Sequence, residues 1–158
     1  MTNIGNGLPY IIGFRLDGSI EEGDLFWYPQ TNATVNAFTP VIFSSGNVVQ
    51  NTTTMAATFA GIAAITQANA GAAGSVTIPV IKPNPQKAFW APVLSASVAT
   101  AAAVGTLCDF DATGLGVSLT SNSPTAYGMQ IIDIDISTLA LAANSKGFVK
   151  VRFIAASE

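Results

Sequence analysis

A two-residue alternation of apolar and charged side chains near the C-terminus restricts the fold of this chain more than any other feature. It occurs in "MQIIDIDIS" at 129–137 and again in "FVKVRFI" at 148–154. Successive side chains of a strand point to opposite faces, so each segment is expected to be a strand with one buried face. The inward residues predicted for the two strands are Ile132, Ile134 and Ile136, and Val149, Val151 and Phe153.

These two strands are expected to pair as one antiparallel hairpin. If Ile134 lies opposite Val151, the outward residues also match by charge. That register gives the cross-strand pairs Asp133–Arg152 and Asp135–Lys150. Opposite charges facing each other across a sheet contribute about 0.2–1 kcal/mol per pair, and a slip of one residue would turn the isoleucines outward.

Strand-like segments continue through the rest of the chain, separated by Gly, Asn and Pro. Strands are predicted at 10–16 and 25–29 and on both sides of a turn at Gly46–Asn47. A hairpin with a long loop is predicted from 57–66 and 75–82. A single helix over the Ala-rich part of that hairpin is the alternative, because Ala is the best helix former. Prolines at 79, 83, 85 and 92 limit sheet pairing, so the stretch that contains them is expected at a sheet edge or in a connection.

The predicted fold is therefore all-β, a small antiparallel barrel or sandwich with a flexible N-terminal arm. Residues 1–16 are assigned to the arm and the first strand, and residues 17–158 to a single β-rich domain. With 158 residues the chain is long enough to bury a substantial core without disulfides or metals.

Charge is unusually scarce, at 9% of the residues, and no charged side chain occurs between Leu25 and Ile81. Typical soluble domains have about 25% charged residues, so a surface this neutral suits a protein that is covered by partners. No segment has the roughly 20 mostly apolar residues of a membrane span, and six scattered Lys and Arg residues do not make a nucleic-acid site. The first ten residues also lack the basic and apolar regions of a signal peptide.

The sequence has few of the side chains that commonly act in catalysis. There is no His, which excludes His-based triads and ordinary zinc sites, and the single Cys108 cannot form an internal disulfide. No cofactor is predicted. The acidic turn containing Asp17, Glu21, Glu22 and Asp24 is interpreted as a solvated loop rather than as the carboxylate pair of a glycosidase.

The segment "CDFDATG" at 108–114 resembles the nucleophile motif of haloacid-dehalogenase phosphatases and the start of an EF-hand loop. The phosphatase motif belongs at the end of the first parallel strand of an α/β domain, and no alternating strand and helix pattern surrounds Asp109 and Asp111. The EF-hand loop needs Glu at its twelfth position, where this chain has Thr120. The preferred interpretation is a turn in which Asp111 and Thr113 bond the local backbone and Gly114 takes a positive φ.

Two groups of apolar residues are candidates for contacts outside the core. The first group follows the arm and is predicted either to dock on a neighbouring subunit or capsid by strand addition, or to be a core strand. Its members are Leu8, Tyr10, Ile11, Ile12 and Phe14. The second group, Phe26, Trp27 and Trp90, is interpreted as core anchors, with a sugar-binding platform as the alternative.

Three segments resemble the head-decoration, or cement, proteins of tailed bacteriophages. They are "FAGIAAITQANAGAAGSVTIPV" at 59–80, "VGTLCDFDATGLGV" at 104–117 and "GFVKVRFI" at 147–154. The resemblance implies a non-enzymatic, β-rich virion protein. It would be assembled in the host cytoplasm and bound on the capsid surface as a homotrimer or other symmetric oligomer, bridging subunits of the major capsid protein. A tail or fibre module, a jelly-roll coat subunit and a carbohydrate-binding β-sandwich are the alternatives.

Overall fold

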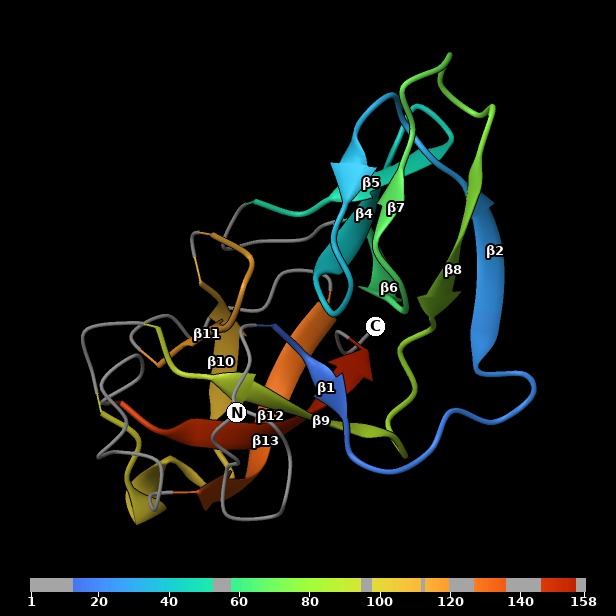
Figure 1. The fold of residues 1–158 in the computed structure, drawn as a ribbon. Coiled ribbons are helices and arrows are strands. Elements are labelled where there is room, and N and C mark those ends of the chain that lie inside the picture. The colour runs from blue at the N-terminus through green and yellow to red at the C-terminus, as the bar shows by residue number, and fades with distance from the viewer. Residues whose placement is uncertain are drawn as a thin grey trace, which may run out of the picture.

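The computed structural model describes residues 13–52, 58–94, 98–111, 113–119, 127–135 and 146–155, and these form an all-β fold. They comprise two antiparallel sheets of six and five strands and a short two-stranded ribbon beside the five-stranded sheet (Figure 1). The predicted all-β class is confirmed. The helical alternative for the Ala-rich segment is wrong, because its described part begins with a strand, and the helical element of the described chain is one 3-10 turn at Ala101–Ala103. The predicted flexible arm, residues 1–12, lies outside the described residues.

The six-stranded sheet combines the first strand with the C-terminal half of the chain. In spatial order its strands are β1 (Arg15–Leu16), β9 (Ala88–Pro92), β13 (Phe148–Ala155), β12 (Tyr127–Asp135), β10 (Leu107–Phe110) and β11 (Val117–Ser118). Each strand pairs antiparallel with its neighbours. The longest ladder joins β12 to β13, the hairpin predicted from the alternating sequence pattern.

The five-stranded sheet is built from the middle of the chain. Its strands, in spatial order, are β2 (Leu25–Pro29), β8 (Thr77–Ile81), β6 (Phe59–Ala63), β4 (Pro40–Ser44) and β5 (Asn47–Gln50). The sheet curls until the chain just after β2 meets β5, where Gln30 bridges Val48 and the Thr31 N–H donates to the Val48 oxygen at 3.0 Å. The ribbon of β3 (Thr34–Val35) and β7 (Gln67–Ala68) completes this part of the molecule.

Two apolar cores are buried, one between the sheets and one inside the curled sheet. The first contains side chains of the six-stranded sheet together with Phe59, Ile62 and Ile81 from β6 and β8. The second is lined by small and branched residues from the five-stranded sheet and the ribbon. They are Val35, Val41, Val48, Ala60, Ala63, Ile78 and Val80.

Strand β6 contributes to both cores, and Gly61 makes this arrangement possible. The register of β6 against β4 shifts near Gly61, so Phe59 and Ile62 reach the first core while Ala60 and Ala63 reach the second. Gly61 has φ 144°, and a Cβ there would collide with the Ile81 backbone oxygen. Only glycine fits a backbone of this conformation at so close an approach.

The β12–β13 hairpin has a different register from the predicted one. Ile134 lies opposite Val149 rather than Val151, and Asp133 lies opposite Lys150 rather than Arg152. The predicted pairs Asp133–Arg152 and Asp135–Lys150 are therefore wrong. Asp135 lies opposite Phe148.

The prediction fails because Met129 and Ile131 are already inward residues of β12, opposite Phe153 and Val151, so that Ile134 comes opposite Val149. A β-bulge between Ile131 and Asp133 then changes which of the following residues face inward. Met129 and Ile131 are buried in the first core. With strict alternation the next side chain to point into that core would be Asp133. An extra residue, Ile132, restores the inward position at Ile134 and leaves Ile132 itself exposed. The expected burial of Val149, Val151 and Phe153 on β13 is confirmed, whereas Ile136 lies outside the described residues.

Two smaller expectations about turns and prolines also need correction. The β4–β5 turn is centred on Ser45 and Gly46, with φ 50° and 79°, because the type of two-residue turn that suits a hairpin requires two positive φ values. Pro79 lies inside the sheet, in β8 between β2 and β6, rather than at an edge. Its missing N–H is tolerated because β6 and β8 pair only at two residues next to it, and its carbonyl still accepts from the Ala64 N–H at 3.0 Å.

Candidate interaction surface

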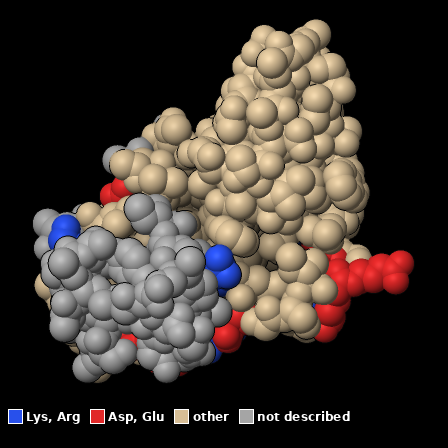
Figure 2. Space-filling view, in the orientation of Figure 1, with Lys and Arg blue, Asp and Glu red and all other residues tan. Residues whose placement is uncertain are grey.

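The stretch without charged residues, 25–81, coincides with one spatial unit of the fold, which we call the uncharged lobe. It begins at the first residue of β2 and ends at the last residue of β8, so it contains the whole five-stranded sheet and the ribbon. Figure 2 shows this lobe as a continuous surface without acidic or basic side chains, with the charges gathered at its base. The longest neutral stretch of the sequence thus forms one half of the molecule.

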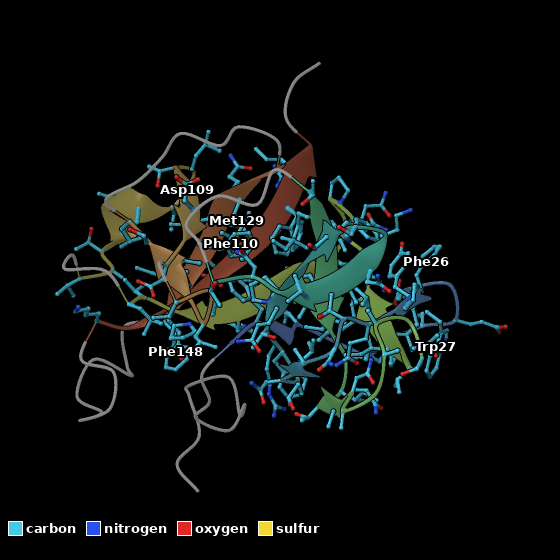
Figure 3. The ribbon with its side chains drawn as sticks, turned by 90° about the horizontal axis from the view of Figure 1, so that it is seen from above. Phe26, Trp27, Asp109, Phe110, Met129 and Phe148 are labelled. Atoms are coloured by element: carbon cyan, nitrogen blue, oxygen red, sulfur yellow. The ribbon has the colours of Figure 1, made fainter. Side chains whose placement is uncertain are left out.

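Large apolar side chains are exposed on the uncharged lobe. Trp27 is 64% exposed, and Phe26, Phe43 and Ile65 are between 37% and 41% exposed. The interpretation of Phe26 and Trp27 as core anchors is therefore wrong, while that of Trp90, which is 5% exposed, is confirmed. Figure 3 shows Phe26 and Trp27 on the outer side of the lobe, far from Asp109, Phe110 and Met129.

Three rings form a row along the uncharged lobe. Phe26 stacks on Tyr28 with a centroid distance of 6.4 Å, and Tyr28 meets Phe43 edge to face at 5.0 Å. The Lys82 ammonium lies 4.6 Å from the Phe26 centroid. Since Phe26 already has a neighbouring ring and a cation, Trp27 offers the least covered aromatic surface.

Strand β2, which carries Trp27, is an edge strand. At its end this strand meets β5, where Gln30 bridges Val48. Among the described residues nothing pairs with the outer side of Leu25–Trp27, and Figure 1 shows β2 at the periphery of the sheet. Proteins commonly protect such edges with charged side chains, but β2 has none. Its protection is limited to its short length and to Pro29 at its end.

The hydrogen bonds on either side of β2 show which backbone groups face outward. The Asp24 oxygen accepts from the Lys82 N–H at 3.0 Å, and the Gln30 N–H donates to the Val76 oxygen at 2.9 Å. Backbone groups of successive strand residues point to alternate sides, so the even-numbered residues of β2 bond to β8. The N–H and C=O groups of Leu25 and Trp27 consequently point to the free edge.

Two buried amide side chains hold the end of the uncharged lobe where β2 finishes. The Gln30 Nε2 atom donates to the oxygens of Ala33 and Gln67 at 2.6 and 2.8 Å. The Asn69 Nδ2 atom lies 3.1–3.2 Å from three backbone oxygens, including that of Gln30, and its Oδ1 atom accepts from Gly71 and Ser75. These bonds tie the long β7–β8 loop to the end of β2 and make the lobe a defined surface.

Phe14, one of the predicted contact residues, is a core residue. It is fully buried, with its ring 5.4 Å from Phe110 and 6.2 Å from Phe153. The prediction that Phe14 contacts a neighbouring subunit or capsid is therefore wrong, and the alternative of a core position is confirmed. The other four members of that group, Leu8, Tyr10, Ile11 and Ile12, lie outside the described residues.

The "CDFDATG" segment begins in β10 and continues into a turn that contains Asp111, Thr113 and Gly114. Asp111 Oδ2 accepts from the Thr113 N–H at 2.9 Å and from its hydroxyl at 2.6 Å, and Gly114 has φ 71°. These contacts confirm the preferred interpretation. Asp109 is buried in β10 opposite Ser118, and no group of three or more His, Cys, Asp or Glu side chains in the described parts of the chain could hold a metal ion.

Cys108 is not a reactive thiol. Burial, reinforced by the negative charge of Asp109, raises the pKa of Cys108 to about 12. Because the thiolate is the nucleophilic form, the folded protein holds this side chain in its inert state near neutral pH. Cys108 therefore acts as a small apolar residue of the first core.

The charges at the base of the uncharged lobe form structural pairs. Lys87 lies 3.2 Å from Asp24 and 3.4 Å from Glu21, and the Glu21 N–H donates to Asp24 at 2.7 Å. That backbone bond, followed by Lys87, lowers the pKa of Asp24. The bond to Asp24 in turn raises the pKa of Lys87. These carboxylates have the partners expected of a folded turn, in agreement with its interpretation as a loop.

The second ion pair involves the outward face of β13. Asp17 contacts Lys150 at 2.9 Å and accepts from the Trp90 indole at 3.3 Å, while Lys150 lies 5.0 Å from the Trp90 centroid. Arg152 donates to the Gln130 oxygen. Lys150 and Arg152 are thus paired, but with Asp17 and Gln130 rather than with Asp135 and Asp133. Trp90 is covered and offers no platform for a sugar.

Comparisons with known proteins do not identify a relative: no family model, no curated protein and no solved structure matches the chain. The described residues contain no helix with the length and apolar character needed to cross a membrane. The free edge of β2 and the exposure of Trp27 were missed by sequence reasoning. The available signal was the aromatic strand 25–29 directly after the acidic turn, but the sequence does not reveal which strands flank it.

Proposed function

We propose that this protein is a structural assembly protein that binds a large protein surface through its uncharged lobe and catalyses no reaction. The observation that carries the proposal is the confinement of the uncharged sequence, 25–81, to one exposed lobe with Trp27, Phe43 and Ile65 on its surface. Burying such a surface removes no charged group from water, and small side chains lose little conformational freedom.

The partner we propose is the major capsid protein of a tailed bacteriophage, with this chain as a decoration protein on the capsid surface. Support comes from the resemblance of segments 59–80, 104–117 and 147–154 to cement proteins and from the neutral lobe. A decoration protein binds many identical sites on one shell, so several weak contacts by a symmetric oligomer add to a strong attachment. A homotrimer is the oligomer that the resemblance favours.

Capsid binding tests this proposal directly. Purified protein is mixed with expanded, empty phage capsids from the same source, and bound protein and the capsid melting temperature are measured. We expect saturable binding and a higher melting temperature. Ile65→Lys, which places a charge on the uncharged lobe, is expected to weaken binding by about tenfold or more, since it buries an unpaired charge.

Arg152→Gln provides the matched control, because it changes one exposed charge on the six-stranded sheet and leaves the lobe intact. It is expected to bind as the unmodified protein does. Absence of capsid binding, or equal loss in both variants, would contradict the proposed function.

A carbohydrate-binding surface around Trp27 is the second candidate, favoured by the 64% exposure of its indole. Aromatic faces in water provide large apolar contact surfaces for flat ligands. A glycan-array screen with the unmodified protein and Trp27→Ala decides this candidate. Saturable binding that the substitution abolishes would support it, and an array without binding would reject it.

A further inference from the structure

We infer that Arg15 is a carboxylate-binding site at the rim of the uncharged lobe, and that it takes an aspartate or glutamate side chain of the capsid partner. The inference deepens the proposed function and rests on it, because it names one contact of that partner. Three observations carry it: a guanidinium without an acceptor, an aromatic ring that holds it, and the placement of the acidic residues of the chain.

The guanidinium of Arg15 has no hydrogen-bond acceptor in the part of the chain that the structure describes. Its Nε atom is buried without a partner, and none of the ion pairs at the base of the lobe includes it. The side chain as a whole is only partly buried, so another molecule can reach it. A guanidinium is always charged in proteins and donates several hydrogen bonds, so a carboxylate that reaches Arg15 gains charged hydrogen bonds that the fold does not supply.

Phe38 fixes the position of this guanidinium. The Arg15 Cζ atom lies 4.5 Å from the centroid of the Phe38 ring. The Phe38 N–H donates to the Ala63 oxygen at 2.8 Å, and the Phe38 oxygen accepts from the Phe14 N–H at 2.6 Å. These two bonds help to hold Phe38 at φ 64°, a conformation that bulky residues rarely adopt. The donors of Arg15 are therefore held in place before a ligand binds, which limits the entropy lost on binding.

The chain itself leaves almost no acidic residue for Arg15. Eight of its nine Asp and Glu residues lie in described parts of the chain, and none of these eight forms an ion pair with Arg15. Asp17, two residues later, contacts Lys150 at 2.9 Å instead. The ninth acidic residue is Glu158.

The direction of β13 carries the chain away from Arg15 before Glu158 is reached. Arg15 lies opposite Trp90 on one side of β9, and Lys150 lies opposite Trp90 on the other side. Strand β13 continues for five residues beyond Lys150, to Ala155. An acidic side chain of another molecule is therefore the ligand that fits Arg15 best.

The local charge favours a carboxylate over a phosphate group. A phosphate group on a protein carries a charge of about −1.5 to −2 at neutral pH and needs more than one cation. Lys150, in the same sheet, is already paired with Asp17, so Arg15 offers a single unpaired positive charge. One carboxylate matches this charge, and the planar guanidinium can bind it through two parallel N–H···O bonds.

Arg15 lies where the six-stranded sheet meets the uncharged lobe, because β1 belongs to the sheet and Phe38 lies between β3 and β4. A partner that covers the lobe therefore has part of its edge near Arg15. Contact surfaces commonly have an apolar centre and a polar rim, and charges at the rim set specificity and the rate of association. The neutral lobe is expected to supply most of the affinity, and Arg15 one fixed point that orients the partner.

Nitrogen-15 NMR of the arginine side chains tests the site without capsids. Arg15 and Arg152 are the two arginines of the chain, so two Nε–Hε signals are expected, and Arg152→Gln assigns them. Sodium acetate is the probe, with sodium chloride at the same ionic strength as the reference. We expect the Arg15 signal to shift and saturate with acetate, and the Arg152 signal not to saturate. The same response at both arginines, or none at Arg15, would overturn the inference.

Glu158→Gln checks the remaining acidic side chain of the chain. If Glu158 does not reach Arg15, this substitution leaves the Arg15 signal unchanged before acetate is added. A shifted Arg15 signal in Glu158→Gln would show that the chain's own tail occupies the site, and the inference would be wrong.

Capsid binding provides the second measurement. Arg15→Gln should weaken binding by about tenfold or more at low salt, and high salt should reduce the difference because it screens the charge pair. Arg15→Lys should recover only part of the binding, since Lys lacks the planar guanidinium. Arg152→Gln is again the control that binds as the unmodified protein does, and circular dichroism confirms that each variant folds.

The two proposals fail separately. Capsid binding that Ile65→Lys weakens and Arg15→Gln leaves unchanged would overturn the carboxylate site and leave the proposed function standing. Saturable acetate binding at Arg15 in a protein that binds no capsid would reject the proposed function, together with the capsid as the source of the acid, and would leave the carboxylate site standing.

Discussion

Replacing Phe14 by Ala tests whether this residue belongs to the core, as the structure shows, or to an external contact. Phe14 is fully buried among Phe110 and Phe153, at centroid distances of 5.4 and 6.2 Å. Removing a buried Phe side chain costs about 3–5 kcal/mol, the transfer free energy of the ring plus the cost of the remaining cavity. Since domains of this size are stable by only about 5–15 kcal/mol, the loss would be a large fraction of the total.

Urea unfolding followed by tryptophan fluorescence measures the effect of Phe14→Ala. At about 2–4 °C per kcal/mol, the melting temperature should also fall by about 6–20 °C. Phe14→Leu fills much of the space and should cost about 1–2 kcal/mol. Trp27→Ala, at an exposed position, should change the free energy of unfolding by about 0.5 kcal/mol or less. All variants are compared at one low protein concentration, because any association between subunits would stabilise the folded state.

A free energy of unfolding for Phe14→Ala within about 1 kcal/mol of the unmodified protein would refute the core assignment. The refutation would be complete if the same variant lost capsid binding or self-association instead. That pattern would return Phe14 to the contact surface predicted from the sequence.

Four further substitutions or conditions test other parts of the structure. Gly61→Ala should destabilise the protein by at least about 3 kcal/mol in urea unfolding, because it adds a strained φ and a clash with the backbone of the next strand. Asn69→Ala should cost about 1–3 kcal/mol and speed amide exchange in the β7–β8 loop, since it leaves buried backbone groups unbonded. Cys108, whose pKa burial raises to about 12, should resist a thiol-specific disulfide reagent at pH 8 until urea unfolds the chain; rapid native labelling would contradict its burial. The lowered pKa of Asp24 means that the bond from the Glu21 N–H to the ionised carboxylate stabilises the fold at neutral pH, and that this stabilisation is lost as the pH falls through that pKa. Asp24→Asn should therefore lower the melting temperature at neutral pH but leave it unchanged in strong acid.

Much of the local structure could be predicted because strand alternation is a property of neighbouring residues. The alternating pattern identified β13 with its buried face, and Gly and Asn identified most turns. The Asp111–Thr113 turn was predictable for the same reason, since a short side chain bonds the backbone two residues away whatever the rest of the fold does.

The candidate surface was only half predictable. The absence of charged residues from 25 to 81 can be read directly from the sequence, and it predicted a surface covered by a partner. That these residues form one lobe depends on β2 pairing with β8, about 50 residues later in the chain. The sequence of β2 is compatible with a central or an edge strand, so the exposure of Trp27 could not be derived from it.

By itself the sequence determined the strand character of the chain, its lack of histidine and the position of its neutral stretch. Tertiary structure alone decided the register of β12 on β13, the burial of Phe14 and the free edge of β2. The physical reason is that alternation records which faces are apolar, whereas register and edges depend on which distant segments fill the same core. The extra residue Ile132 lets Ile131 and Ile134 both face the core, and charge pairing across the hairpin is too weak to outweigh that burial.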